Sequence, residues 1–419
     1  MIIPMSTLKT KHLTIDLEKI QNDLKPVWKR FDTIKDFTQV KVLNAFKQAG
    51  IQNSHFSWVT GYGYDDLGKD KLDELYAAYF NTEAALVRPQ LVSGTHAIAS
   101  AIFGNLKSGD RLITVGKPYD TLQTVFDKWS ERFGIELVSL RAEGEVIQLT
   151  DFVGELNCLD NARNDKGHDL YFIQRSRGYE WRDSHSLDYI EKLIVEIKSQ
   201  NPKAIVFVDN CYGEFTQERE PTDIGADLIA GSLIKNPGGG IVAAGAYIAG
   251  KEELVNNAAD FVTAPGIGKH GGCMFDQTRL YFQGFFMAPL IVSEALKGMS
   301  LAAKVFENMG LETLPGSESD RNDIIQAIKF NDKDKLIEFC KIVQNNCPIN
   351  SMFSPIPDDI SGYDDQVIMA SGSFIEGSSI ELSADGPLRE PFVGYFQGGL
   401  SYAHTKHVLS QIILSDNLG

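Results

Sequence analysis

The stretch Asp227–Gly240, DLIAGSLIKNPGGG, contains both a candidate buried strand and a candidate reactive amine. Its apolar half is typical of a strand that ends at Gly-Ser. Lys235 follows, directly before Asn-Pro-Gly-Gly-Gly, a run that indicates a turn with unusual backbone freedom. Lys235 is therefore either an ordinary solvent-facing lysine or a reactive amine placed at a strand end. Other parts of the sequence are needed to distinguish these two roles.

Other short apolar runs resemble this one and alternate with helix-like segments. The candidate strands are RLITV (111–115), IELVSL (135–140), LYFIQ (170–174), AIVFVDN (204–210) and DLIAGSL (227–233). Segments such as SLDYIEKLIVEIKSQ (186–200) have the apolar spacing of helices. This alternation predicts an α/β fold with a mainly parallel sheet covered by helices.

The sequence character changes twice along the chain. We predict an amphipathic helical arm over residues 1–50, a large domain over 51–297 and a smaller C-terminal α+β domain over 298–419. In the last of these, residues 317–346 have a helical pattern, and residues 364–386 have the pattern of paired strands joined by glycine turns.

Composition excludes several classes of protein. The chain has 419 residues, a formal net charge of -16 and 43% hydrophobic residues, which is ordinary for a globular enzyme and disfavours nucleic acid as a partner. No CxxC motif or metal-ligand cluster is visible, so we predict no metal. The five cysteines are Cys158, Cys211, Cys273, Cys340 and Cys347.

Location is predicted from the cysteines and the apolar segments. Few, scattered cysteines and an N-terminus with no long apolar core favour a cytoplasmic protein without a signal peptide. Residues 281–299 are strongly apolar but contain Gly284, Pro289 and Glu294. We therefore expect a buried helix or interface segment there rather than a membrane span.

Polar residues follow the predicted strands at positions where α/β proteins bind ligands. Asp209 ends the run AIVFVDN, where a carboxylate is either a turn residue or a functional group. Ser93, Gly94, Thr95 and His96 precede a helix of small residues, and such a helix start either binds phosphate or is capped by its own serine.

Two further side chains complete the pattern. Tyr119 lies in a loop after a strand, where an aromatic ring either covers a planar ligand or simply packs. Lys235 is flanked by apolar residues, so we expect burial to lower its pKa and keep the amine neutral, as Schiff-base chemistry requires.

Together these features match the needs of one cofactor, pyridoxal 5'-phosphate. Its phosphate needs backbone N–H groups, its ring a stacking partner, its pyridine nitrogen a carboxylate and its aldehyde a lysine. The order of an anion cradle, an aromatic residue, Asp209 and Lys235 along the chain supplies all four.

The chain also resembles a known family over nearly its whole length. It is similar to the fold-type I pyridoxal-phosphate enzymes, which have the aspartate aminotransferase-like fold, and within them to the cystathionine β-lyase-like branch labelled "aluminium resistance protein". The segments that carry the resemblance are TGYGYDDLGKDKLDELYA (60–77), LVRPQLVSGTHAIASAIFG (86–104), YFIQRSRGYEWRDS (171–184), VFVDNCYGEF (206–215), GSLIKNPGGG (231–240), SDRNDIIQAI (319–328) and IELSADGPLREPFVGYFQGGLSYAH (380–404).

The resemblance implies a role for each matching residue. Lys235 forms the Schiff base and shuttles protons, Asp209 pairs with the pyridinium nitrogen, and Tyr119 stacks on the ring. The phosphate is bound by Gly94, Thr95 and Ser232, and the neighbouring Ser93 and His96 are also candidates for binding the cofactor. Tyr64 matches an aromatic residue that a neighbouring subunit contributes to the site. Arg389 is the candidate clamp for the substrate carboxylate. The residues to which the resemblance gives a role in the site are Ser93, Gly94, Thr95, His96, Tyr64, Tyr119, Asp209, Ser232, Lys235 and Arg389.

The chain departs from the better-known lyases in two places. They have Tyr-x-Arg where this chain has Tyr64 without an arginine two residues later, which leaves the cation that pairs with the phosphate unassigned. Arg175 or Arg177 either supplies it or belongs to a structural ion-pair network, and Arg177 is also a candidate for binding substrate. In addition, Ala243 and Ala244 stand where a Pro-Thr type pair is expected.

Three roles for the chain follow as expectations. The first is a pyridoxal-phosphate-dependent carbon–sulfur lyase that acts on an amino acid of the cystathionine, cysteine or methionine type by β- or γ-elimination. The second is another reaction of the same cofactor, such as transamination or retro-aldol cleavage. The third is an idle metal-tolerance or interaction protein on the same fold. For a lyase, we expect a homo-oligomer, a dimer or tetramer with shared active sites, and no membrane partner.

Overall fold

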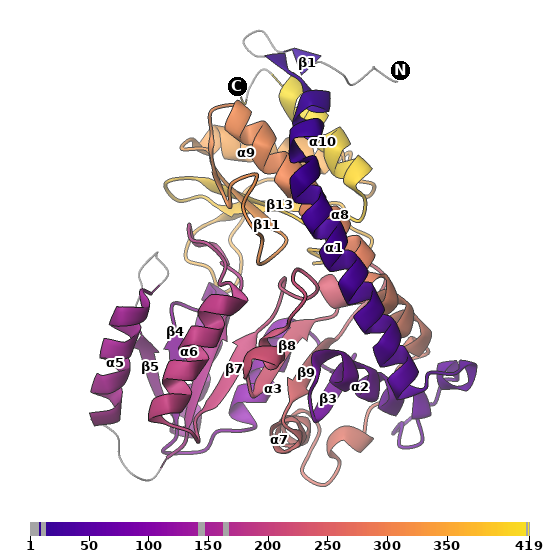
Figure 1. Ribbon diagram of the computed structural model, residues 1–419, viewed down its shortest axis with the longest axis vertical. Coiled ribbons are helices and arrows are strands. Elements are labelled where there is room, and N and C mark those ends of the chain that lie inside the picture. The colour runs from indigo at the N-terminus through magenta and orange to yellow at the C-terminus, as the bar shows by residue number, and fades with distance from the viewer. Residues whose placement is uncertain (1–7, 10–13, 141–146, 162–166, 416–417, 419) are drawn as a thin grey trace.

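The computed structural model describes residues 8–9, 14–140, 147–161, 167–415 and 418. Two large sheets organise these residues, beside a short two-stranded one. The long helices α1 (Leu17–Ala49) and α8 (Thr278–Asn308) lie side by side, and α8 also contacts the strands of the second large sheet (Figure 1). Of the predicted N-terminal arm, residues 1–7 and 10–13 lie outside the described part of the chain.

The elements follow one another in this order. The helices are α1 (Leu17–Ala49), α2 (Leu67–Phe80), α3 (Gly94–Phe103), α4 (Asp120–Phe133), α5 (Leu149–Asn161), α6 (Leu187–Gln200), α7 (Glu252–Val262), α8 (Thr278–Asn308), α9 (Lys333–Asn345) and α10 (Tyr402–Leu414). The strands are β1 (Leu8–Lys9), β2 (Thr14–Ile15), β3 (Ala84–Arg88), β4 (Arg111–Val115), β5 (Glu136–Leu140), β6 (Asp169–Gln174), β7 (Ile205–Asp209), β8 (Leu228–Ser232), β9 (Ala246–Gly250), β10 (Glu312–Leu314), β11 (Ile325–Lys329), β12 (Val367–Ser371), β13 (Ser383–Pro387) and β14 (Val393–Gln397).

The larger sheet has the strand order β3-β9-β8-β7-β6-β4-β5. Strands β4 to β8 pair in parallel, whereas β9 runs antiparallel to both β8 and β3. The predicted, mainly parallel sheet is confirmed, and each predicted strand forms one of β4 to β8. Because β3 and β8 are both antiparallel to β9, they run in the same direction. Their carboxyl ends therefore meet at one edge of the sheet.

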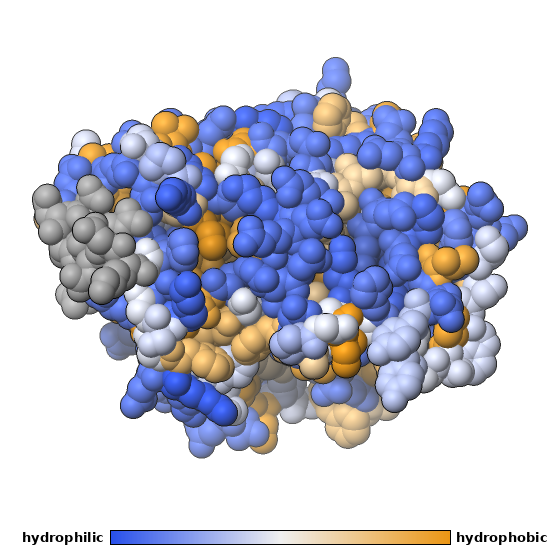
Figure 2. Space-filling model, turned by 90° about the horizontal axis from the view of Figure 1, so that it is seen from below, coloured by the Kyte–Doolittle hydropathy of each residue, from blue (hydrophilic) through white to orange (hydrophobic). Residues whose placement is uncertain are grey.

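The outer surface is largely polar on the face seen from below the view of Figure 1. Figure 2 shows this face as mostly hydrophilic, with small and separate hydrophobic spots.

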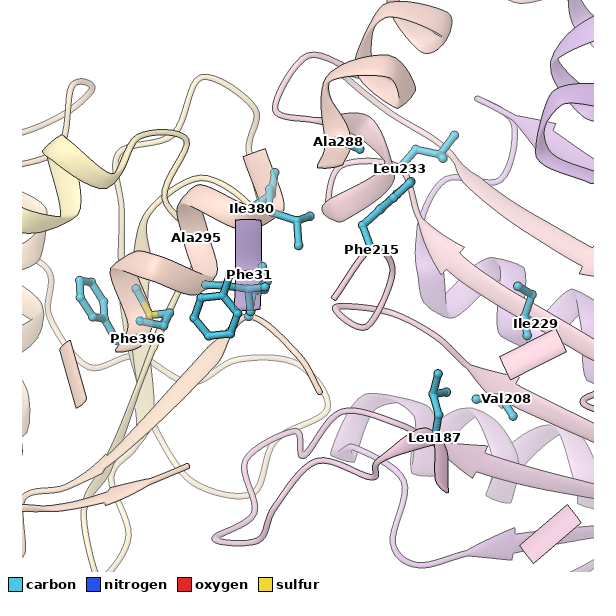
Figure 3. Packing of buried hydrophobic residues seen from close by; sticks show 14 of the residues in the cluster. Phe31, Leu187, Val208, Phe215, Ile229, Leu233, Ala288, Ala295, Ile380 and Phe396 are labelled. Atoms are coloured by element: carbon cyan, nitrogen blue, oxygen red, sulfur yellow. The ribbon is translucent and has the colours of Figure 1, made fainter. Parts of the chain in front are cut away.

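Both faces of the larger sheet are buried except at the edge strand β5, where Glu136 and Ser139 are exposed. Along β4, Ile113 belongs to the cluster shared with α1, α6 and α8, whereas its neighbour Leu112 belongs to the cluster under α3, α4 and α7. Strands buried on both sides are almost continuously apolar, which explains why the runs were recognisable in the sequence. Figure 3 shows the first cluster, from Val208 and Ile229 in this sheet across to Phe396 in the second sheet.

The second sheet is antiparallel, with the order β10-β11-β14-β13-β12. The predicted pairing within residues 364–386 is confirmed, since β12 pairs with β13. The helical prediction for residues 317–346 is wrong in part, because Ile325–Lys329 forms strand β11 and α9 begins only at Lys333. Ile325 and Ile328 face different clusters, and a short run buried on two sides cannot be told from a buried helix by its apolar spacing.

Helix α8 (Thr278–Asn308) has the length and apolar character of a membrane-crossing helix, with a mean hydropathy of 1.3 over its most apolar window. In the structure 67% of that window is buried inside the protein. The helix packs against α1 and continues through residues 297 and 298, where we placed a domain boundary. The domain limits remain predictions.

A buried ion pair fixes the end of β3, just before the loop that leads to α3. Arg88 donates two hydrogen bonds to Asp73, from Nη1 to Oδ1 at 2.7 Å and from Nη2 to Oδ2 at 2.9 Å. Nη2 also donates to the carbonyl of Lys269 at 2.9 Å. Arg88 thus joins α2, β3 and the loop after α7.

Replacing Arg88 by methionine should strongly destabilise the fold, because it leaves the Asp73 carboxyl buried without its cation. We expect a loss of about 3–5 kcal/mol in the free energy of unfolding, measured by urea titration. The matched control is Arg219→Met, which removes an exposed pair with Asp188 and should cost about 1 kcal/mol or less. Equal losses for the two variants would contradict the structural role of the Arg88–Asp73 pair.

Candidate active site

A cavity of about 280 Å³ lies between the carboxyl edge of the larger sheet and the second sheet. Asp209 ends β7, Ser232 ends β8 and Lys235 follows three residues later, so the parallel strands carry all three to one place. Tyr395 and Asp385 of the second sheet also line it, beside Tyr179 from the loop after β6. The cavity therefore has one wall from each sheet.

Lys235 projects its amine onto an aromatic ring in this cavity. Nζ lies 3.9 Å from the centroid of the Tyr212 ring. Burial opposes a charge on this amine, but Tyr212, Cys211 and Asp209 outweigh it and raise the pKa of Lys235 above the usual lysine value. Our expectation of a lowered pKa is therefore wrong, because the sequence did not reveal how many electronegative groups surround Nζ.

The carboxyl group of Asp209 is buried at the end of β7. Its Oδ1 accepts a hydrogen bond from the backbone N–H of Cys211 at 3.1 Å. Burial raises the pKa of Asp209, and the Cys211 N–H and the charge of Lys235 partly offset this effect. Asp209 is thus a buried acid at the floor of the cavity, held by one backbone donor.

The N-terminus of α3 points its free N–H groups toward the same cavity. Ser93 caps the helix, since its Oγ accepts from the N–H of His96 at 3.0 Å. A Cβ atom on Gly94 would lie 3.2 Å from Cys211 Sγ and 3.3 Å from Ser232 Cβ, so glycine permits this close approach. Ser93, Gly94, Thr95 and Ser232 all line the cavity, where they form an anion cradle.

Tyr119 lies at the start of α4 and closes the cradle from another side. Its hydroxyl is 2.6 Å from Thr95 Oγ1, and its backbone N–H donates to Gln174 Oε1 at 2.9 Å. Burial, and then the nearby Asp209, raise the pKa of the Tyr119 hydroxyl, so this group stays protonated at neutral pH. Tyr119 can therefore both cover a planar ring and donate a hydrogen bond.

Two predicted cofactor residues do not line the cavity. The ring of His96 turns back along its own helix, where Nδ1 accepts from the backbone N–H of Val92 at 3.2 Å. Tyr64 is 52% exposed and stacks on Tyr62 at 5.4 Å between ring centroids. Within one chain, Tyr64 is not among the residues that line the cavity.

The structure separates the candidate arginines. Arg177 and Arg389 both line the cavity. Arg177 is buried and donates to the carbonyl of Leu314 at 2.8 Å, whereas Arg389 is partly exposed and lies 3.3 Å from Asp365. Arg175 lies behind the cavity in a buried network, where Nη1 donates to Asn210 Oδ1 at 2.7 Å. Of the two readings for Arg175, the structure favours the ion-pair network.

Several cavity residues were not found from the sequence. Tyr212 has a φ of 70°, a left-handed conformation that turns its ring under Lys235. Gln174 holds the Tyr119 loop, and Tyr179, Tyr395 and Asp385 come from distant segments. Tyr212 lies directly after Cys211, and Gln174 is the polar end of a predicted strand, so both carried a local signal. Asp385 and Tyr395 reach the cavity only through the docking of the second sheet.

The cavity suits an anionic, planar ligand with a carbonyl group. The α3 cradle matches a phosphate, Asp209 matches a protonated ring nitrogen, and the Lys235 amine can bond to an aldehyde. Among the described residues, no group of three or more histidine, cysteine or acidic side chains is arranged to hold a metal ion.

Comparison with known proteins gives a consistent result. Residues 14–416 match the family model described as methionine gamma-lyase. The Bacillus subtilis protein YnbB is 42% identical over 408 residues, which are 94% of each chain. A structure from Listeria monocytogenes, described as a "putative cystathionine beta-lyase involved in aluminum resistance", has a TM-score of 0.90 at 42% identity and covers 95% of this chain and 98% of that one.

Other solved structures extend the comparison. A carbon-sulfur lyase involved in aluminium resistance from Clostridium novyi has a TM-score of 0.88 at 45% identity, with 94% of each chain covered. The pyridoxal-5'-phosphate dependent protein YhfS from Escherichia coli shares the fold alone, with a TM-score of 0.60 at 15% identity. A Campylobacter jejuni structure at 15% identity, which contains a pyridoxyl-lysine phosphate, also shares the fold.

Thiol labelling tests the burial of Cys211 in the cavity. Cys158 is exposed, whereas Cys211, Cys273, Cys340 and Cys347 are buried, and burial raises the pKa of the Cys211 thiol. We expect a single fast-reacting thiol in the native protein, measured with Ellman's reagent, and its loss in Cys158→Ser. A second fast thiol that persists in Cys158→Ser would show that Cys211 or another buried cysteine is accessible.

Proposed function

The chain belongs to the methionine gamma-lyase family, and from this premise we propose that it is a pyridoxal-phosphate-dependent carbon–sulfur lyase acting on a sulfur-containing amino acid. The observation that carries the proposal is the meeting of Lys235, Asp209 and the α3 cradle in one cavity. Each feature has an ordinary structural explanation on its own. Together in one cavity, the lysine, the carboxyl group and the helix N-terminus match the aldehyde, the ring nitrogen and the phosphate of a single cofactor.

The fit of the cofactor rests on donors and acceptors that are present in the chain. The N–H groups of Gly94 and Thr95 and the Ser232 hydroxyl would hold the phosphate. Asp209 would hold a proton on the ring nitrogen, and Tyr119 would lie against the ring. Bound there, pyridoxal phosphate supplies an electron sink for negative charge that develops on the α-carbon of the substrate.

Lys235 is the base that we propose for the α-proton. Because its neighbours raise its pKa, Nζ carries a proton at neutral pH unless that proton is transferred first. Tyr212 lies 3.9 Å below Nζ and keeps the amine over one face of a ring. Once Nζ has lost its proton it can accept the α-proton and later return it, which is the general acid–base role of a positioned amine.

Tyr119 is the second group that can move a proton in the cavity. Its hydroxyl remains protonated, shares a hydrogen bond with Thr95 and lies close enough to Asp209 for the two to interact. A protonated hydroxyl at this place can donate to a departing thiolate. In β-elimination the carbon–sulfur bond breaks, a thiol leaves, and hydrolysis of the remainder gives pyruvate and ammonia. Lys235 and Tyr119 serve γ-elimination equally, which would end in a 2-oxo acid such as 2-oxobutyrate.

We further propose that each active site is completed by a second copy of the chain. Tyr62 and Tyr64 are 76% and 52% exposed and stacked together. Lys69 holds this loop, because Nζ donates to the carbonyl of Gly63 at 2.8 Å and to that of His270. A fixed and exposed aromatic pair is suited to a protein partner, and the resemblance assigns Tyr64 to the cofactor of the neighbouring subunit.

Arg389 is the proposed clamp for the substrate carboxylate. It lines the cavity and its side chain is 40% exposed, so a substrate carboxylate could share the guanidinium with Asp365, which lies 3.3 Å away. Arg389→Met should raise the KM for substrate more than about tenfold with a smaller change in kcat, because this contact is made equally in the ground and transition states. Steady-state kinetics would measure it, and an unchanged kcat/KM would assign the carboxylate to Arg177 instead.

Borohydride trapping tests the covalent role of Lys235. The purified protein, incubated with pyridoxal phosphate and then reduced, should carry a phosphopyridoxyl group on the peptide that contains Lys235. The readout is peptide mass spectrometry. Lys235→Ala should lose the label, whereas Lys117→Ala, which changes another cavity lysine that is paired with Asp120 at 3.0 Å, should keep it.

The outcomes of this experiment separate the alternatives. A label on other lysines but not on Lys235 would remove the enzyme hypothesis. If Lys235 is labelled, release of pyruvate or 2-oxobutyrate together with a thiol from cystathionine, cysteine or methionine supports the lyase. Amine transfer that depends on an added keto acid, without thiol release, would replace the lyase by a transaminase.

A further inference from the structure

Four acidic side chains line the cavity, and a neighbouring cation or the proposed mechanism accounts for three of them. Asp120 lies 3.0 Å from Lys117 Nζ, Glu180 lies 2.6 Å from Arg182 Nε, and Asp209 accepts from the Cys211 N–H. The fourth acid is Asp385, which the proposed mechanism does not use.

Among the described residues, Asp385 has uncharged hydrogen-bond partners but no cation beside it. It lies in the middle of β13, between β12 and β14, and its Oδ2 accepts from Gln397 Nε2 at 3.0 Å. Its buried Oδ1 has no close donor of its own, and the Tyr179 hydroxyl, which interacts with the same carboxyl group, acts to lower its pKa. In the described part of the chain, no lysine, arginine or histidine nitrogen lies within 4.0 Å of this carboxyl group, and its interaction with Lys235 is longer-range.

The surroundings of Asp385 suit a cation. Tyr179 lies against Tyr395 at 5.1 Å and Tyr363 at 5.5 Å between ring centroids, and all three rings line the cavity with Asp385. Tyrosine rings and hydroxyl oxygens attract a positive charge, and their carbon faces can pack against an aliphatic stem. An opposite charge placed next to a poorly solvated carboxyl group favours its ionised form.

We propose that Asp385 is a specificity-determining residue that selects substrates with an ammonium group beyond the sulfur atom. The inference rests on the proposed function, because there the α-amino group of the substrate reacts at the Lys235 side and its α-carboxylate meets an arginine. Only a second cation, on the part of the substrate that leaves with sulfur, remains for Asp385. The favoured class is therefore an S-substituted cysteine or homocysteine whose substituent ends in an amine.

The charge of Asp385 makes this selection dependent on pH. Burial raises the pKa of Asp385 to about 7, although Tyr179 and Lys235 act to lower it. The other groups that face it are Tyr363, Tyr395 and Gln397 from the second sheet and its approach, and Cys340 from α9. Above this pKa the carboxylate attracts an ammonium group; below it the neutral acid does not. Preference for a distal cation should therefore rise as the pH increases through 7.

Two substrates that differ only at their distal end test the proposal. S-(2-aminoethyl)-L-cysteine ends in an ammonium group where S-propyl-L-cysteine ends in a methyl group of similar size. For the wild-type protein loaded with pyridoxal phosphate at pH 8, we expect kcat/KM to favour the aminoethyl compound about tenfold, as a charge-assisted hydrogen bond allows. In Asp385→Asn the ratio should fall to about one, whereas Asp120→Asn, the matched change at a paired cavity acid, should keep the preference.

A binding measurement separates this inference from the lyase proposal. Isothermal titration with L-lysine and L-norleucine, which have no sulfur to release, compares the same two ends without turnover. The wild-type protein should bind L-lysine more tightly at pH 8 and lose that preference at pH 6. If the protein prefers L-lysine but never releases a thiol, the lyase proposal is wrong and the proposed cation subsite is still supported.

The proposal is overturned by any of three results. The wild-type protein shows no preference for the distal ammonium group at pH 8, or Asp385→Asn retains the preference, or the preference does not depend on pH between 6 and 8. If Asp385→Asn lowers kcat/KM equally for both substrates, the preference is retained and the proposal is overturned. If Asp385→Asn does not fold, as judged by its thermal unfolding, the pH series on the wild-type protein carries the test.

Discussion

The electrostatic balance around the amine of Lys235 is the constraint on which the rest of the site depends. A buried amine is costly unless opposite charges or polar groups surround it. Here Tyr212, Cys211 and Asp209 provide that environment. Asp209 ends β7 and the other two lie in the turn that follows, while Lys235 lies in the turn after β8. The parallel pairing of β7 and β8 brings these two turns to the same edge of the sheet. The fold thus places the amine and its neighbours together before any ligand is considered.

The surrounding structure holds these two turns against each other. Asn236, directly after Lys235, donates through Nδ2 to the carbonyls of Tyr212 at 3.0 Å and Glu214 at 2.9 Å. Gly238 allows the chain to fold back tightly, since a Cβ there would collide with the carbonyl of Leu233 at 1.7 Å. These contacts explain why the sequence needs Asn-Pro-Gly-Gly-Gly after the lysine. Chemistry at Lys235 therefore relies on a rigid turn that the strand alone would not provide.

The sequence was sufficient for the features that depend on local pattern. Strands buried on both faces are nearly all apolar, so β4 and β6 to β8 were predictable, and the more exposed edge strand β5 was still recognisable from its apolar residues. Asp209 and Lys235 followed as polar residues at or just after a strand end. It failed where tertiary packing outweighs local pattern. Strand β11 was taken for part of a helix, and the direction of the pKa shift of Lys235 reversed once its neighbours were known. Asp385 became a candidate only when the docking of the second sheet placed it in the cavity.

A titration of the purified chain with pyridoxal phosphate, followed by visible absorption, tests the central claim most directly. We predict that pyridoxal phosphate binds saturably at a single site, with a spectral change that Lys235→Ala abolishes. Asp209→Ala should weaken it, because one ligand would contact the strand-end acid and the lysine together. Binding that does not saturate, or a Lys235→Ala spectrum that matches the wild type, would contradict the conclusion that these residues form a single cofactor site.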